Sequence, residues 1–507
     1  MAPERAQDGR LRVILREVAA SDYGRRHRLH EVGSYADFAR RVPIVDYDAL
    51  VPWIDRVAAG EQDVLSLGRV LALEPTGGSS GTAKWIPFTR PFVSEIARAT
   101  SAWLADLHTS RPELRGTRSY WAISPAVRRE RVTSGGVRLG LDSDADYFGA
   151  FARWAIEHLW AVPQNVATSP TIDVWRERTC LALLAASDLG LISVWSPSFL
   201  TLLLREIESH LGEYLARLPA ARARDIQQAL AAAGAFSVRA LWPRLALVSS
   251  WTSGSATLLV PALERYLAGV PLQPKGLIAT EGIVSFPLDG EQGAVLAVGS
   301  HFLEFLDLEG NGRDVRRAHE LREGAHYSPI LTASNGLVRY HLKDVVRCVG
   351  HTAATPRVVF EGRLDRTSDL AGEKLTEVLV RQIIVDASAA LGIAPRFVLL
   401  APELLPPRYV LYVEADAAAV QCEQLGRLVE TALRATHHYD YCRALGQLGP
   451  LEVVSVHEGH AMYLRELVLR GRKLGDIKPT ALETSTGWRE VLTPRPVPQT
   501  ASDTPPP

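Results

Sequence analysis

The first sixty residues show the periodicity of helices. Between residues 10 and 60, apolar side chains recur at spacings of three and four, at Leu11, Ile14, Leu15 and Val18. This spacing places them on one helical face and predicts helices. Pro43 and Pro52 predict breaks in the helical stretch, because proline lacks a backbone donor and clashes with the preceding turn.

Single strands and helices then alternate along the chain. The run VLALEP at 70–75 predicts a buried strand that enters a glycine-rich turn. Further helices are predicted over 90–107, 148–160, 199–235 and 256–268, and a strand over 244–251. The segment 182–197 predicts a helix, a glycine turn and a strand. From Lys275 to about Val359 only short strands follow one another. The pattern predicts an α/β body with an added β-barrel-like portion.

A change of pattern marks a boundary at 362–370. After it, a helix, two strands joined by Pro-Pro and another helix predict a compact α+β unit. We expect a large N-terminal domain over residues 1–365 and a small C-terminal domain over 366–485. Residues 486–507 end in a segment rich in Pro, Ser and Thr and are expected to be disordered.

Composition excludes several classes of protein. The 507 residues carry 56 Lys and Arg against 57 Asp and Glu, which argues against a nucleic-acid partner. Charges interrupt the N-terminus, and no apolar run reaches the roughly 18 residues that span a membrane. The four cysteines form no CxxC pair, so we expect buried thiols in a reducing, cytoplasmic compartment.

The segment from Thr76 to Lys84, TGGSSGTAK, is the richest in chemistry. Its glycines allow close backbone approach, and its hydroxyls, N–H groups and lysine suit a polyphosphate. A solvated glycine-serine turn is the plain alternative. A Walker loop does not fit, because Lys84 is preceded by Ala83 and followed by Trp85. A nucleophile elbow around Ser79 requires a helix directly afterwards, and TAKWIPFT does not predict one.

The loop resembles the signature of adenylate-forming enzymes. The longer string SSGTAKWIPFT resembles that of the plant auxin-responsive acyl-acid amido synthetases and their bacterial relatives. Other segments resemble the same family in the same order, up to the C-terminal tail. These segments are RRVPIVDYDALVPWIDRV, SYWAISPA, LWPRLALVSSWTSGS, GLIATEG, GLVRYHLKDVV, FEGRLDRTSDLAGEKLTE and RKLGDIKPTAL.

The resemblance implies a nucleotide site and assigns residues to it. Binding of ATP is implied for Thr76, Gly78, Ser79, Ser80, Gly81, Thr82, Ser253, Gly254, Ser255, Thr280, Asp344 and Arg363. Asp344 corresponds to the ribose-binding aspartate, and Glu281 would hold Mg²⁺. Lys84, Glu281 and Lys478 are the implied catalytic residues. Leu277, Val338 and Lys343 depart from the plant pattern, which has Tyr, Tyr and Gly there.

The activity that the resemblance implies is an ATP-dependent ligase. It would activate a small carboxylic acid as an acyl adenylate and transfer the acyl group to an amine or amino acid. The small C-terminal domain would be mobile and pivot at Asp365 and Arg366. Tyr120, Ile123 and Trp160 are candidate residues of the acid pocket, although aromatic residues more often pack in a core. Two alternatives stay open: a thiol acceptor such as coenzyme A or a carrier protein, and a member that only binds nucleotide.

Overall fold

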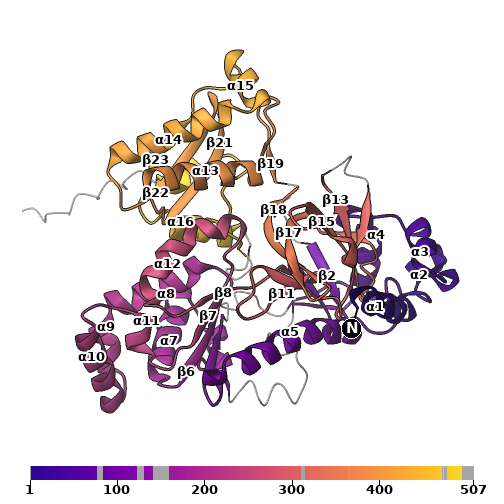
Figure 1. Ribbon diagram of the computed structural model, residues 1–507, viewed down its shortest axis with the longest axis horizontal. Coiled ribbons are helices and arrows are strands. Elements are labelled where there is room, and N and C mark those ends of the chain that lie inside the picture. Colours follow the sequence, from indigo (N-terminus) through magenta and orange to yellow (C-terminus); the bar gives the residue numbers. More distant parts are fainter. Residues whose placement is uncertain are drawn as a thin grey trace, which may run out of the picture. The chain divides into compact units, whose positions relative to one another are not determined.

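The chain divides into two compact units in the computed structural model. The first unit comprises Met1–Asp365 with Lys473–Pro479, and the second comprises Arg366–Arg472 with Thr480–Pro507 (Figure 1). The structure describes residues 2–76, 84–122, 131–140, 159–309, 314–364, 366–470, 472 and 477–493. In this part of the chain no helix is long and apolar enough to cross a membrane.

The first unit opens with a group of helices. They are α1 (Pro3–Val18), α2 (Asp22–Arg26), η1 (Leu29–Glu31), α3 (Tyr35–Arg41) and α4 (Tyr47–Ala58). The predicted break at Pro43 is confirmed, since α3 ends at Arg41. The predicted break at Pro52 is wrong, because α4 continues through it. Pro52 removes only the helical hydrogen bond to the backbone carbonyl of Asp48, which is an exposed residue.

The glycine-rich segment lies between two paired strands. β1 (Ala72–Thr76) and β2 (Lys84–Phe88) are antiparallel, and β5 (Arg138–Leu139) and β4 (Arg131–Val132) extend the sheet in the order β2-β1-β5-β4. The strand predicted at 70–75 is thereby confirmed. Helix α5 (Arg90–Ser110), which confirms the helix predicted over 90–107, follows β2 and is capped by Thr89.

A four-stranded parallel sheet forms the next layer. Its strands are β3 (Arg118–Trp121), β6 (Leu189–Ser193), β7 (Leu247–Ser250) and β8 (Leu272–Pro274), in that order. Ile192 and Val248 face a core built with α7 (Ile172–Ala185), α8 (Pro197–Ser209) and α12 (Val260–Leu267), which lie beside the strands in Figure 1. Leu191 and Leu247, on the opposite face, pack with Trp103 of α5. The alternation therefore buries both faces of the sheet.

Shorter helices complete this layer. They are η2 (Pro112–Leu114), η4 (Gln164–Thr168), α9 (Leu211–Ala216), α10 (Ala220–Ala233), α11 (Val238–Leu241) and η5 (Gly254–Leu259). The helix predicted over 256–268 is confirmed as η5 and α12. The helix predicted over 148–160 lies mostly outside the described residues.

The strand-rich stretch predicted from Lys275 onward is confirmed as an antiparallel sheet. In spatial order it contains β11 (Ser285–Pro287), β12 (Ala294–Leu296), β18 (Thr355–Arg363), β17 (Asp344–Thr352), β15 (His326–Thr332), β13 (Phe302–Asp307) and β14 (Val315–Arg317), and β16 (Tyr340–His341) also pairs with β15. β9 (Ile278–Ala279) and β10 (Gly282–Ile283) form a separate hairpin, and η6 (Ala318–Glu320) follows β14. Within the described residues β11 and β14 are the two edges, so the expected barrel is a sheet with open edges.

The second unit is an α+β layer. β21 (Phe397–Leu404) and β22 (Pro407–Glu414) are antiparallel, and β23 (Glu452–Ser455) runs parallel to β22. The accompanying elements are β19 (Thr367–Ser368), β20 (Leu375–Thr376), α13 (Glu377–Leu391), α14 (Ala419–Arg434), α15 (His437–Ala444), α16 (Gly459–Leu469) and α17 (Trp488–Leu492). The predicted order helix, strand, strand, helix is confirmed by α13, β21, β22 and α14.

Candidate active site

The two ends of the glycine-rich loop are held by strand pairing. Thr76 and Lys84 are direct partners in the β1–β2 ladder. Next to Lys84, the backbone N–H of Trp85 donates to the hydroxyl of Tyr47 at 2.7 Å, and Lys84 Nζ lies 5.4 Å from the centroid of the Tyr47 ring. Gly78, Ser79, Ser80, Gly81 and Thr82 lie outside the described residues. Since a strand begins at Lys84, the helix that a nucleophile elbow requires is not formed there.

Thr280 and Glu281 form the two-residue turn between β9 and β10. The turn needs a glycine at its end, because Gly282 has φ of 152° and a Cβ there would lie 2.9 Å from Leu331 Cδ2. The hydroxyl of Tyr340 lies 3.5 Å from Glu281 Oε1. Burial, together with the negative charge of Glu281, raises the pKa of Tyr340. Tyr340 is therefore a neutral donor that faces the carboxylate.

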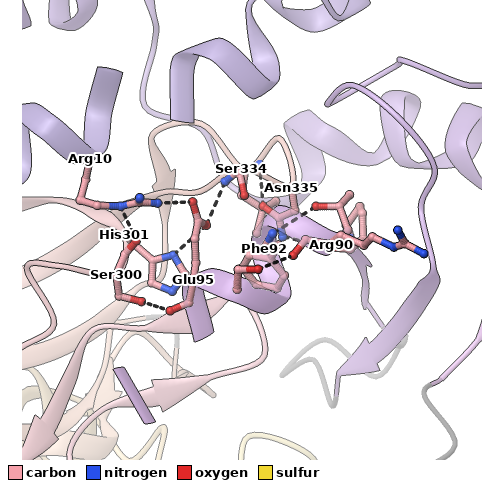
Figure 2. Close-up of polar contacts among 12 residues, drawn as sticks. Arg10, Arg90, Phe92, Glu95, Ser300, His301, Ser334 and Asn335 are labelled. Carbon is pink, nitrogen blue, oxygen red and sulfur yellow. Dashed lines mark hydrogen bonds and ion pairs between the residues drawn. The ribbon is translucent and has the colours of Figure 1, made fainter. Parts of the chain in front are cut away.

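A buried ionic network supports this turn from behind. Glu95 of α5, only 2% exposed, accepts from Arg10 Nη2 at 2.7 Å, and its other oxygen lies 3.2 Å from His301 Nδ1 (Figure 2). The backbone N–H of Ser334 donates to the same carboxylate at 3.1 Å. A Cβ on Gly282 would lie 3.0 Å from His301 Nε2, so the imidazole packs directly against the end of the turn. The network joins α1, α5 and the residues before β13, and sequence reasoning missed it.

Asp344 and Arg363 are opposite each other at the adjoining ends of β17 and β18. Arg363 Nη1 lies 3.7 Å from Asp344 Oδ1, and Asp344 is 2% exposed. The hydroxyl of Ser328 donates to the backbone carbonyl of Asp344 at 2.7 Å, which fixes the start of β17. Two residues that are nineteen positions apart in the sequence are thus direct cross-strand partners.

Ser253, Gly254 and Ser255 form the start of η5 beside the same strand. Ser253 is the N-cap, and Gly254 has φ of 61°. A Cβ at Gly254 would lie 2.7 Å from Cε1 of Phe360, in β18. The backbone can therefore approach β18 this closely only because position 254 is glycine.

Lys478 lies near this turn. Its segment belongs to the first unit, and its Nζ is 5.7 Å from the centroid of the Trp251 ring, two residues before Ser253. Cation–π contacts of this kind hold an ammonium group without neutralising its charge.

The three candidate residues of the acid pocket have different positions. Tyr120 is 1% exposed and lies in the core formed with α7 and α8, where its ring packs. The backbone of Trp160 bridges to Ser119, and its side chain is half-buried. Ile123 lies outside the described residues. Trp121, the neighbour of Tyr120, faces the opposite side of the sheet with Trp103.

An enzyme that adenylates a carboxylate needs donors and cations for phosphates and a carboxylate that can accept from sugar hydroxyls. The first unit carries such groups on the β1–β2 hairpin, the β9–β10 turn and the β17–β18 pair. Groups of this kind are what an adenylate-forming ligase requires.

Comparisons with known proteins narrow the class. The N-terminal domain of the GH3 family matches residues 1–220, its central domain residues 294–363 and its C-terminal domain residues 383–486. The chain belongs to the GH3 family and is an acyl acid amido synthetase, a ligase that adenylates an acyl acid and conjugates it to an amino acid. The resemblance inferred from the motifs is thereby confirmed.

Two plant relatives and one solved structure illustrate the similarity. Indole-3-acetic acid-amido synthetase GH3.8 of Oryza sativa subsp. indica is 25% identical over 532 residues, which cover 92% of this chain and 86% of the rice protein. Indole-3-acetic acid-amido synthetase GH3.15 of Arabidopsis thaliana is 25% identical over 406 residues, which cover 70% of this chain and 67% of that protein. The structure of AtGH3.15 acyl acid amido synthetase in complex with 2,4-DB matches with a TM-score of 0.83 at 21% identity, over 96% of this chain and 93% of the other.

Proposed function

We propose that the first unit binds ATP between the β1–β2 loop, the β9–β10 turn and the β17–β18 pair. Loop residues 76–82 would supply N–H and hydroxyl donors to the phosphates, with Lys84 as a fixed cation at the end of the loop. Asp344 would accept from the ribose hydroxyls, and Arg363 would hold Asp344 or a phosphate. The Ser253–Ser255 turn and Thr280 would lie beside the adenine and the α-phosphate.

The position of Tyr340 is the observation that carries this proposal. Its hydroxyl faces Glu281, and its backbone pairs with Val45, two residues before the loop anchor Tyr47. Asp344 follows four residues later at the start of β17. One short, buried segment therefore joins the three elements that we assign to the nucleotide.

The donor set suits a magnesium ion that arrives with ATP. Enzymes that use Mg²⁺ with nucleotides commonly hold it through one or two carboxylates and the phosphate oxygens. Glu281 provides one carboxylate at the turn, and the described residues contain no group of three or more acidic, His or Cys side chains that could hold a metal alone. Glu281 and the phosphates would therefore share the ion, which would supply positive charge at the α-phosphate.

Electrostatics dominate the first step that we propose. The carboxylate of the acid attacks the α-phosphate, so two anions must approach each other. Lys84 and Lys478 would stabilise the charge that accumulates in the transition state. The bond to pyrophosphate breaks, and an acyl adenylate remains. In the second step the amine nitrogen of an amino acid attacks the acyl carbon, an amide bond forms, and AMP leaves.

The acid would lie at the carboxyl end of the parallel sheet, where ligands of α/β proteins commonly bind. Trp121 faces this region from β3, whereas Tyr120 is part of the core behind the sheet. The four cysteines are free and buried, which supports our proposal of a reducing compartment such as the cytoplasm.

The decisive experiment follows both half-reactions. Exchange of labelled pyrophosphate into ATP that depends on added acid would support adenylation, and no exchange with any of a broad panel of acids would contradict it. Mass spectrometry of reactions that contain mixed amino acids or coenzyme A then identifies the acceptor. An amide product supports the proposal, and a thioester in its place would establish the thiol alternative.

A variant tests the role of Lys478 within this scheme. Lys478→Ala should slow acid-dependent release of pyrophosphate by at least about tenfold, since a charge-assisted contact to a phosphate is lost. The matched control is Lys374→Ala, which removes an exposed lysine of the second unit. Normal release by Lys478→Ala would show that Lys478 only packs against Trp251.

A further inference from the structure

One row of side chains crosses the whole parallel sheet. Trp121 of β3 is in register with Ser193 of β6, Ser193 with Ser249 of β7, and Ser249 with Gln273 of β8. Residues in register on adjacent strands point to the same face. All four therefore face the side where Trp103 of α5 packs, near the carboxyl ends of the strands.

Lys275 extends into this row from the end of β8. Its Nζ donates to Ser193 Oγ at 2.7 Å, and the side chain is almost fully buried, at 5% exposure. Three indole rings surround the amine, with centroids 5.1 Å (Trp195), 5.3 Å (Trp103) and 5.9 Å (Trp121) from Nζ. An ammonium has three donors, so one hydroxyl leaves it incompletely hydrogen-bonded.

Two neighbours of Lys275 have unsatisfied polar atoms as well. Ser249 Oγ and Gln273 Nε2 have no hydrogen-bond partner among the described residues, although both are buried. The Gln273 carbonyl oxygen is already used by Trp103 Nε1, at 3.0 Å. Buried polar groups without partners are uncommon in folded proteins, and a cluster of them points to a bound molecule or water.

The choice of lysine at this position is itself informative. Only six of the 56 basic residues are lysines, so the chain uses arginine almost everywhere else. Arginine stays charged in proteins, whereas a buried lysine can lose its proton. Burial lowers the pKa of Lys275 to about 7, while the indole faces favour the ammonium form. The amine can therefore change its protonation state when a ligand binds.

Aromatic contacts connect Lys275 to the site described above. The Trp195 and Trp251 rings are 5.5 Å apart, and Lys478 Nζ lies over Trp251. Lys478 and Lys275 are thus the two ends of a series of indole contacts. Flat aromatic surfaces of this kind suit a flat aromatic ligand.

We propose that Lys275, with Ser193, Ser249 and Gln273, binds a second acidic group on an aromatic substrate acid, remote from the carboxylate that is adenylated. This inference rests on the proposed function and specifies its substrate class. The body of the acid lies against the indoles, and its second acidic group takes the hydrogen bonds that the row leaves unmade. An apolar acid of the same size would leave the amine, the hydroxyl and the amide without partners, which disfavours it.

The test compares matched acids on the full-length protein. Phenylacetate is paired with 4-carboxyphenylacetate, and benzoate with terephthalate. Binding is measured by calorimetry, and kcat/KM by pyrophosphate exchange without any amino acid. Wild-type protein should prefer the substituted member of a pair by about tenfold or more. Lys275→Met should remove most of that preference, because a hydrogen bond to a charged group accounts for about tenfold or more in binding.

Two further variants keep the test specific. Ser193→Ala removes the acceptor of Lys275 but keeps its charge, and should reduce the preference less, by about threefold. Lys374→Met removes an exposed lysine and should leave the preference as in wild type.

The outcomes separate this inference from the proposed function. Equal binding of both members of every pair by the wild-type protein, or an unchanged preference in Lys275→Met, would overturn the inference. Exchange with the unsubstituted acids would still support the proposed function in that case. A defect of Lys275→Met that appears only in the KM for the amino acid would assign Lys275 to the acceptor and overturn it as well.

Discussion

Two buried cations of the first unit, Arg10 and Lys275, differ in how fully their charges and N–H donors are paired within the protein. Arg10 donates through Nε to the carbonyl of Ser300 at 2.8 Å and through Nη2 to Glu95 at 2.7 Å. Glu95 also accepts from Ser334 and contacts His301, so the charges of Arg10 and Glu95 each have an opposite charge or a dipole beside them (Figure 2). Lys275 Nζ contacts one hydroxyl and three indole rings, and it forms no ion pair with a carboxylate of the described residues.

The difference helps to distinguish a buried charge that stabilises the fold from one that binds a ligand. The charges of Arg10 and Glu95 are paired within the protein, and their position behind the β9–β10 turn explains their presence, although His301 Nε2 and Ser334 Oγ of the same network have no hydrogen-bond partner among the described residues. The Lys275 row is incomplete within the protein, so the fold alone does not explain why a lysine lies there. A buried charge without an opposite charge should make the protein less stable than an apolar residue at the same position would. A paired buried charge should make the protein more stable than a variant that lacks one of the two partners.

The largest effect is expected from Glu95→Gln. This change leaves Arg10 buried without its counter-charge, which costs about 3 to 5 kcal/mol of unfolding free energy. Urea unfolding at pH 7 measures the loss. The same change at the exposed Glu213 is the control and should alter stability by less than about 0.5 kcal/mol. Equal losses of unfolding free energy for Glu95→Gln and for the control would mean that Glu95 does not stabilise the buried charge of Arg10.

Lys275→Met should have the opposite sign. Burial lowers the folded pKa from 10.5 to about 7, so the unfolded chain binds more protons between these two values. Below pH 7 the lysine carries its full destabilisation, and the variant should be more stable than wild type by about 3 kcal/mol after the indole contacts are discounted.

The pH dependence gives the sharper test of this variant. Its advantage should shrink as the pH rises from 7 toward 10.5, and above 10.5 the wild-type lysine is mostly neutral in both the folded and the unfolded state. Melting temperatures between pH 6 and 10 measure the trend, and Lys374→Met should show no such trend. A variant that is less stable than wild type at pH 6 would contradict the comparison.

A second ion pair, between Asp344 and Arg363, extends the comparison to activity. Asp344 and Arg363 are cross-strand partners, yet their charged atoms are 3.7 Å apart, beyond the 2.7 Å of the Arg10 pair. Asp344→Ala should raise the KM for ATP about tenfold to a hundredfold, since hydrogen bonds between the carboxylate and the ribose are lost. Steady-state kinetics with saturating acid measures this, with the exposed Asp314→Ala as control. Unchanged ATP kinetics would remove Asp344 from the nucleotide site.

The smallest effect is expected from the hydroxyls of the row. Ser193→Ala should lower stability by about 1 kcal/mol at pH 6, because the charged amine loses its acceptor. Ser249→Ala removes a buried hydroxyl without a recorded partner and should be neutral or slightly stabilising. Chemical unfolding of both variants under identical conditions decides whether the two positions differ.

Most helices and strands of the fold could be predicted from the spacing of apolar residues in the sequence. Helix α5 and strands β1 and β7 appear where the apolar spacing predicts them, because each buries one continuous stripe or run. The break at Pro52 was wrong because a proline in the second turn removes a single hydrogen bond, which the rest of α4 tolerates. The barrel was only partly predictable, since sheet edges depend on pairings between distant segments.

Prediction of the candidate site from the sequence was limited in a different way. Individual motifs suggest Lys84, Glu281 and Asp344 as residues of the nucleotide site, because groups that bind phosphate or ribose lie close together in short motifs; these assignments stay predictions. The Lys275 row forms no such motif, since register across four strands between Trp121 and Gln273 brings it together. One signal for the Arg10 network was present: Glu95 falls on the buried stripe of α5, between Phe92 and Ala99. A lone acid on an apolar stripe indicates a buried partner.

The row of one residue per strand also defines how this enzyme could be altered by design. Trp121, Ser193, Ser249 and Gln273 each project from a different strand, so they can be varied in combination without neighbouring changes along one backbone. The positions immediately before and after them point into the opposite layer. Under our proposal, a combinatorial library for new acid preferences needs four codons, and a single-residue deletion within any of these strands would move that strand's member of the row to the opposite face of the sheet.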